Sequence, residues 1–460
     1  MGPRSRAVAL VGCAALGFVS VLRIPTSAAV FTRSTTNGSD SFASGSLLAP
    51  DPPSCAWTGA NSLSFGWTST SALADGYQAE RSNSAGSGYA ALATVVGVAS
   101  VSTTDANPSP PTLRYYRVRS YAGSGWTSAY GTVTASNTCD GTILTAVTAG
   151  TVTDPTGVAV DSSGNVFTSS GSGNAIFKTT PAGVTTTYAG NGTAGYSGDG
   201  GAASAAKLNT PKSVAIDGSN NLYFVDNGND VVRKITSGGT ISTVAGNGLA
   251  GYSGDNGAAI SARLNNPFGV SVDGSGNLYI ADTGNNVIRK VSGGTITTIA
   301  GTGVAGYTGD GGSPTSAQLN FPYYALADGT GKVYISDFNN SVVRRISGGL
   351  ITTIAGAGVN TACSFSGSAS SAGFDQPKRM AYDSATGRIF IPDAGQNCVR
   401  VLNGTNIGPA VGTGTNSSTG DNGPAIAATV GGPTAVAWSA AGDLYVADST
   451  GPSTRRVLQP

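Results

Sequence analysis

Aspartate and arginine recur seven residues apart in five places along the second part of the chain. In a sixth place both are missing, and Ser170 and Phe177 stand there instead. Because the two are lost together, we predict that they contact each other, as a carboxylate and a guanidinium on neighbouring strands can. We interpret them as structural pairs, with a ligand site as the alternative. The pairs are Asp226/Arg233, Asp282/Arg289, Asp337/Arg344, Asp393/Arg400 and Asp448/Arg455.

Three nearly identical glycine-rich segments each carry a tyrosine and an aspartate. Residues 194–201 read Ala-Gly-Tyr-Ser-Gly-Asp-Gly-Gly, and residues 250–257 and 305–312 repeat them almost unchanged. Three interpretations stay open: tight turns closed by aspartate, a recognition surface for a protein or a carbohydrate, and calcium loops. The segments lack the dense acidic run of a high-affinity calcium site, so we expect no cofactor. The candidate ligand-binding residues are Tyr196, Asp199, Tyr252, Asp255, Tyr307 and Asp310.

The composition argues against most catalytic machinery. The chain of 460 residues contains no histidine, and its single glutamate is Glu80. These absences exclude Ser-His-Asp and Cys-His catalysis, imidazole-bound zinc and most glycosidase-type carboxylate pairs. A net charge of +1 gives no strong attraction to nucleic acid. We therefore expect a binding protein that is not an enzyme.

The elements that position these residues are repeated strands. One unit, residues 267–300, contains four runs of β-branched and aromatic residues bounded by Gly, Asn or Asp, which predicts a four-stranded sheet. Such a sheet has two apolar faces and must stack on its neighbours. Six units follow at intervals of 55 or 56 residues, beginning at Pro155, Pro211, Pro267, Pro322, Pro377 and Pro433.

The two ends of the repeat region predict a closed ring. The sixth unit stops at residues 455–460, where its fourth strand should begin, and residues 141–149 resemble the fourth strand at residues 294–300. The first segment should therefore complete the last sheet and leave no open edge. We predict an all-β fold with a six-bladed β-propeller at residues 141–460.

The string from Asp282 to Arg289 (Asp-Thr-Gly-Asn-Asn-Val-Ile-Arg) and its equivalents resemble the NHL repeat, which builds six-bladed propellers. Extracellular NHL proteins of bacteria and the NHL propeller of teneurins carry similar Gly-Asp-Gly-Gly insertions. The resemblance implies a secreted or cell-surface protein that binds a protein or carbohydrate ligand through its insertion-bearing face. The alternative is a propeller enzyme of the lyase or lactonase type with a metal in the axial channel. Such enzymes use histidine-bound zinc or a calcium-binding glutamate, and residues 141–460 contain neither residue type.

Residues 55–140 read as short alternating strands between turns rich in Gly, Ser and Pro. Trp67, the strand from Tyr77 to Arg81 and the strand from Tyr115 to Tyr121 follow one another in an order that resembles a fibronectin type III domain. The resemblance implies a spacer or adhesive β-sandwich. Residues 30–54 are predicted to be a linker.

The N-terminus and the cysteines indicate export. Residues 1–29 have a basic start, an apolar run and a small-residue cleavage site, as a signal peptide does. An uncleaved anchor and a lipoprotein signal at Cys13 are the alternatives. We predict an extracellular monomer that does not insert into the membrane once the signal is cleaved. The four later cysteines suggest two disulfides in an oxidising compartment, and the pairing that keeps each within one domain is Cys55–Cys139 and Cys363–Cys398.

Overall fold

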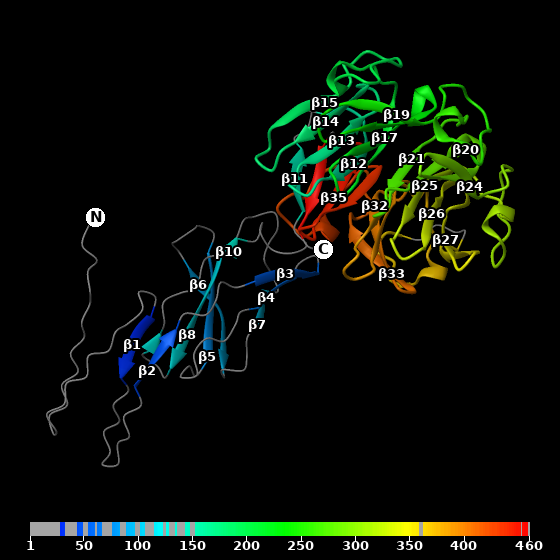
Figure 1. Cartoon of the computed structure of the whole chain (residues 1–460). Helices are drawn as coiled ribbons and strands as arrows, with labels where there is room; N and C mark the ends of the chain where they lie inside the picture. Colours follow the sequence, from blue (N-terminus) through cyan, green and yellow to red (C-terminus); the bar gives the residue numbers. More distant parts are fainter. Residues whose placement is uncertain are drawn as a thin grey trace, which may run out of the picture. The chain divides into compact units, whose positions relative to one another are not determined.

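The chain forms two compact units, Met1–Cys139 and Asp140–Pro460, and both are built from β-strands (Figure 1). The computed structural model describes residues 152–357, 362–451 and 453–458, together with Tyr89 and the strands between residues 28 and 147. Its helical elements in these parts are 3-10 turns of three residues. None of the described helices has the length and apolar character needed to cross a bilayer.

The described strands of the first unit form three sheets. One has the order β3-β4-β7, a second has the order β10-β8-β5-β6 with β9 beside β8, and β1 pairs with β2. The β1–β2 pair occupies part of the segment predicted to be a linker. The predicted Cys55–Cys139 disulfide and the predicted signal segment up to residue 27 lie outside the described residues. The strands are β1 (Ala28–Thr32), β2 (Ser44–Leu48), β3 (Ser54–Gly59), β4 (Ser62–Gly66), β5 (Gly76–Ser82), β6 (Ala90–Val96), β7 (Ser102–Asp105), β8 (Tyr115–Ala122), β9 (Trp126–Thr127) and β10 (Thr134–Ala135).

The second unit is a six-bladed β-propeller, as the repeats predict. Each of the first five blades is an antiparallel sheet of four strands that follow one another in the chain, and blade 6 takes its fourth strand from the start of the unit. Blades 3 and 5 gain a short extra strand at the outer edge (Figure 1). The first four blades are β12 (Pro155–Val160), β13 (Val166–Ser170), β14 (Ala175–Thr179) and β15 (Thr185–Ala189); β16 (Pro211–Ile216), β17 (Leu222–Asp226), β18 (Val231–Ile235) and β19 (Ile241–Ala245); β21 (Gly269–Val272), β22 (Leu278–Asp282), β23 (Val287–Ser292) and β24 (Thr295–Ala300) with β20 (Gly257–Ala258); and β25 (Pro322–Ala327), β26 (Val333–Asp337), β27 (Val342–Ser347) and β28 (Leu350–Ala355). The last two are β30 (Ala381–Tyr382), β31 (Ile389–Asp393), β32 (Cys398–Asn403) and β33 (Asn406–Val411) with β29 (Gly367–Ser368); and β34 (Ala435–Trp438), β35 (Leu444–Asp448), β36 (Ser453–Val457) and β11 (Ile143–Val147).

The hydrophobic core lies between neighbouring blades. Val225 and Val232 of blade 2, for example, share one fully buried cluster with Val270 and Ile280 of blade 3. The apolar faces of each sheet are therefore covered by the next blade, which is why the repeats stabilise one another.

The ends of the propeller close the ring within blade 6. Strand β11 pairs antiparallel with β36, with Ile143 opposite Val457, and both side chains are fully buried. Ile143 also donates its N–H to the Gly423 carbonyl at 3.0 Å and accepts the Asn422 N–H at 2.8 Å. The predicted completion of the last blade is confirmed.

Candidate functional site

A fully buried arginine on the third strand of blade 3 binds two carboxylates. Arg289 Nη1 lies 3.3 Å from Oδ2 of Asp282, the residue predicted to contact it. Its Nε and Nη2 lie 3.1 and 2.7 Å from Oδ1 of Asp255, which belongs to the insertion between blades 2 and 3. The arginine thus ties the insertion to the blade. We call this arrangement the arginine clamp, and it recurs as Asp226–Arg233–Asp199, Asp337–Arg344–Asp310 and Asp448–Arg455–Asp421.

The insertion aspartates are held at both oxygens. Asp199 Oδ1 lies 2.6 Å from Arg233 Nη2, and its Oδ2 accepts the Thr243 N–H at 2.9 Å. Asp310 makes the equivalent two contacts at 2.6 and 3.0 Å. Burial works against ionisation, but the hydrogen bonds and the arginine charge outweigh it and lower the pKa of Asp199 and Asp310. These candidate ligand-binding carboxylates therefore lie within the clamp and are charged at neutral pH.

The insertion tyrosines cover the clamps with one ring face. The ring centroid of Tyr252 lies 5.0 Å from the guanidinium carbon of Arg289, and its hydroxyl lies 2.8 Å from Thr298 Oγ1. Tyr196 and Tyr307 make the same two kinds of contact. The exposed fractions of Tyr196, Tyr252 and Tyr307 are 46%, 52% and 50%. These three candidate residues are held at both ends and still present a face to solvent.

Exposed apolar side chains gather in the connections that carry these insertions, residues 190–210, 246–268 and 301–321. Among the described residues, the large hydrophobic side chains exposed there are Tyr196, Leu249, Tyr252, Ile260, Val304 and Tyr307. The others, Val184 and Leu350, lie at the connections between third and fourth strands. A Cβ on Gly248 would lie 3.8 Å from the Tyr196 ring, so one insertion borders the next. Concentrated exposed apolar surface of this kind marks interaction sites.

The insertions do not build a cation cage in the described parts of the chain. No group of three Cys, Asp or Glu side chains comes together there in a way that could hold a metal ion. The aspartates of the Gly-Asp segments are already engaged by arginine. The geometry therefore gives the calcium interpretation no support.

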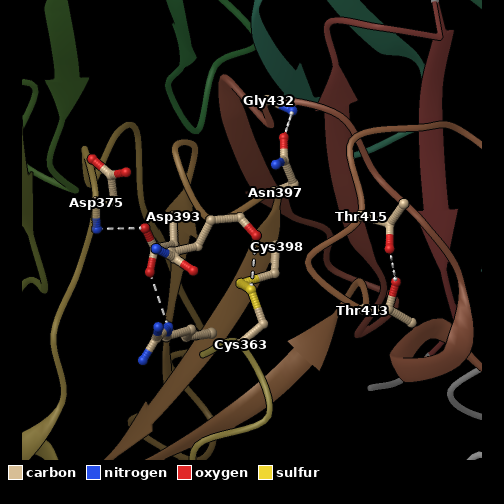
Figure 2. Close-up of a disulfide and its surroundings, with 10 residues drawn as sticks. Cys363, Asp375, Asp393, Asn397, Cys398, Thr413, Thr415 and Gly432 are labelled. Carbon is tan, nitrogen blue, oxygen red and sulfur yellow. Dashed lines mark hydrogen bonds and ion pairs between the residues drawn. A yellow bond between two sulfur atoms is a disulfide. The ribbon is translucent and has the colours of Figure 1, made fainter. Parts of the chain in front are cut away.

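Blade 5 ties its insertion down with a disulfide. Arg400 Nε lies 3.0 Å from Asp393 Oδ2, and its guanidinium carbon lies 5.3 Å from the Phe374 ring centroid. The insertion before this blade has no matching aspartate, and instead its Cys363 is bonded to Cys398, the first residue of β32 (Figure 2). The predicted Cys363–Cys398 disulfide is confirmed. The disulfide joins the insertion to β32, the third strand of blade 5, which carries Arg400.

Removing this disulfide by the double substitution Cys363→Ser/Cys398→Ser is expected to lower the free energy of unfolding by about 4 kcal/mol. The reason is that the bond closes a loop across a sequence separation of 35 residues. Urea unfolding followed by tryptophan fluorescence measures the loss. Equal unfolding midpoints for the double variant and the oxidised wild type would show that the bond adds no stability.

Burial raises the pKa of the strand aspartates, because lost solvation outweighs their hydrogen bonds and the neighbouring arginine. The pKa is about 6 for Asp226, Asp282 and Asp337 and about 7 for Asp393. An unfolded aspartate has a pKa of about 3.9. Between about pH 4 and pH 7 the folded state therefore binds more protons than the unfolded state, so its stability falls as the pH rises.

The melting temperature is accordingly expected to rise when the pH is lowered from about 7.5 to about 5. Differential scanning calorimetry checks this. The variant Asp393→Asn removes the strand aspartate with the highest of these pKa values, so it should flatten the change nearest neutral pH. A melting temperature that drops steadily over this interval would contradict the assignment of protonated strand aspartates.

The link between insertion and blade was missed in the sequence, although a signal is present. The insertion aspartate and the arginine are 34 residues apart in all four clamps. Asp421 lies in a shortened copy of the Gly-Asp segment without tyrosine, and this spacing would have identified it.

Comparison with known proteins agrees with this architecture. Residues 192–253 match the teneurin NHL domain. Teneurin-1 of Gallus gallus is 40% identical over 103 residues, which make up 21% of this chain and 4% of teneurin-1. The chain therefore corresponds to a small part of that relative.

Two solved structures from Bacteroides thetaiotaomicron share the fold. A protein of unknown function has a TM-score of 0.52 at 16% identity, covering 88% of this chain and 98% of its own. An auxiliary nutrient binding protein has a TM-score of 0.51 at 12% identity, covering 88% and 97%. A gluconolactonase from Xanthomonas campestris also matches, with a TM-score of 0.45 at 12% identity, covering 69% of this chain and 89% of its own.

Proposed function

We propose that this is a non-enzymatic binding protein that recognises another protein through the insertion-bearing face of its propeller. The observation that carries the proposal is that exposed Leu249, Ile260 and Val304 belong to the same connections between blades as the three half-exposed tyrosines. Aliphatic and tyrosine side chains together suit the apolar centre of a protein interface better than a carbohydrate. The absence of histidine and the lack of glutamate after Glu80 support a role without catalysis.

The arginine clamps prepare this face for binding. Each tyrosine ring rests on a buried guanidinium and its hydroxyl is hydrogen-bonded, so little rotamer freedom is left to lose when a partner docks. Three insertions on successive blades repeat the same side chains. Such a surface fits a partner that runs across several blades.

We further propose that the protein is secreted or displayed on the cell surface. The Cys363–Cys398 disulfide supports this, because such bonds persist in oxidising compartments. A fibronectin type III-like spacer before the propeller is part of the proposal. Its support is that β3-β4-β7 and β10-β8-β5-β6 are two separate antiparallel sheets, and a domain of that type is built from two such sheets.

The test is a binding screen of the purified chain against arrays of secreted and cell-surface proteins and of glycans, with and without calcium. A ligand of the insertion-bearing face should bind the wild type and lose at least tenfold in affinity, about 1.4 kcal/mol, to Leu249→Ser/Val304→Ser. The matched control is Val184→Ser/Leu350→Ser, which removes exposed aliphatic side chains elsewhere. Ligands that bind both double variants equally well, or that are found on the glycan array alone, would contradict the proposal.

A further inference from the structure

A cavity of about 300 Å³ lies on the propeller axis, where the first strands of the blades end. Small residues at one repeated position leave this space open, because five of the six blades carry alanine or serine where blade 4 carries Leu326. They are Ala159, Ala215, Ser271, Ala381 and Ala437. The insertions lead into the opposite ends of these strands, so this cavity is separate from the insertion-bearing face.

The side chain of Arg379 reaches across the propeller axis and forms part of the lining of this cavity. It belongs to blade 5, yet its Nη2 lies 2.6 Å from the Val214 carbonyl and its Nε lies 3.2 Å from Ser213 Oγ in blade 2, directly opposite. Its Nη1 lies 2.5 Å from the Val436 carbonyl of blade 6, and its guanidinium carbon lies 5.2 Å from the Tyr324 ring centroid. The residue is 6% exposed.

The positive charge of Arg379 has no carboxylate partner within 4 Å in the described part of the chain. Asp383, four residues further along, is paired with Arg388 at 3.1 Å. The acceptors of Arg379 are two carbonyls and a hydroxyl, all neutral, and a guanidinium has five N–H donors. A buried charge without a counter-charge is costly, so an anion bound in the adjoining cavity would be strongly favoured.

The rim of the cavity is aromatic on the side of blades 5 and 6. Tyr382 and Trp438 occupy the repeated position that is Val160 or Ile216 in blades 1 and 2. The Trp438 ring is stacked on Phe390 with centroids 5.1 Å apart, which fixes its plane. Flat aromatic walls close to one convergent charged group are typical of small-molecule pockets, and the volume is at the lower end of their range.

We propose that this axial cavity binds a small aromatic carboxylate. The carboxylate group of the ligand binds Arg379, and its aromatic ring packs against Trp438 and Tyr382. The described part of the chain gives the five N–H groups of the guanidinium three acceptors, so two N–H groups are left to donate to the carboxylate oxygens. The site is independent of the proposed protein-binding face. A carboxylate bound in the cavity supplies the counter-charge that Arg379 lacks. It binds next to the hydrogen bonds by which Arg379 joins blade 5 to blades 2 and 6.

The test uses the full chain and isothermal titration calorimetry with benzoate and phenylacetate, each paired with its uncharged amide, and with inorganic phosphate. The carboxylates should bind at millimolar concentration or below, and the amides should bind at least about tenfold more weakly, because a hydrogen bond to a charged group is lost. Arg379→Met should weaken carboxylate binding by at least about tenfold. Arg263→Met, which removes an exposed arginine from the second insertion, should leave it unchanged.

A second variant keeps the test decisive if Arg379→Met does not fold. Ala437→Leu places in blade 6 the residue that blade 4 carries at the equivalent position, so it should fill the cavity, retain Arg379 and abolish binding. No binding by either carboxylate, equal binding of acid and amide, or unchanged binding by Ala437→Leu would overturn the proposal. Phosphate binding as tight as that of benzoate would overturn the aromatic part of it. Loss of protein binding in Leu249→Ser/Val304→Ser leaves this outcome untouched, so the two proposals fail separately.

Discussion

Arg289→Met is expected to lower the free energy of unfolding of the propeller by about 3–5 kcal/mol, because it breaks a buried ion pair from one side. Asp282 is fully buried and would lose its counter-charge, and Asp255 would lose the contact that fixes its insertion. The expected result in urea unfolding is an earlier midpoint. Amide hydrogen exchange in residues 250–257 should also be faster in this variant than in the wild type, with a smaller change in the strands of blade 3.

The chain itself supplies the matched control for this experiment. Blade 1 has Ser170 and Phe177 at the two positions and folds without the pair. Asp282→Ser/Arg289→Met should therefore cost less than Arg289→Met alone, since no buried carboxylate is left without a partner. Arg263→Met, on an exposed arginine, should change the midpoint little. Equal loss of stability in the single and the double variant would show that the unpaired carboxylate of Asp282 is not the cause of the destabilisation.

The local part of the clamp could be predicted from the sequence, and the long-range part could not. The strand aspartate and the arginine are neighbours in one hairpin, so the seven-residue spacing and the paired loss in blade 1 were sufficient. The insertion aspartate precedes the blade whose third strand carries the arginine, and the two residues are 34 positions apart in the chain. A glycine-rich turn signal does not say which residue anchors the turn, so the contact between Asp199 and Arg233 could not be predicted from it.

The cross-axis arginine shows a similar limit. Arg379 departs from the repeat in a way that is visible in the printed sequence, because the other five blades have at this position Gly157, Ser213, Gly269, Tyr324 and Ala435. The contacts of Arg379 can be predicted only once the ring is known to be closed with six blades, because blade 5 lies opposite blade 2 only in such a ring. The number of blades and the closing strand were predictable because the repeat interval and the unfinished last unit are features of the whole chain. Which side chains then meet on the axis follows from the ring geometry.

Removing β11 is expected to be the most damaging change to the propeller. A chain of residues 152–460 should lose about 3–6 kcal/mol relative to residues 140–460 from the side chains of Ile143 and Val147 alone, both of which are buried. It would also leave β36 as an open strand edge, which favours association between copies. Urea unfolding and light scattering measure the two effects.

The closing strand can be returned as a separate molecule, which makes its role testable without changing the rest of the ring. A synthetic peptide of residues 140–151 should restore the unfolding midpoint and the monomeric mass of the shortened chain, because a strand added at an open edge regains the same backbone hydrogen bonds. A peptide with Ile143→Asp should fail, since it would bury a charge opposite Val457. A shortened chain that unfolds at the same urea concentration as residues 140–460 would mean that blade 6 is stable with three strands, and that the stability of the ring comes from stacking between blades rather than from the joining of its ends.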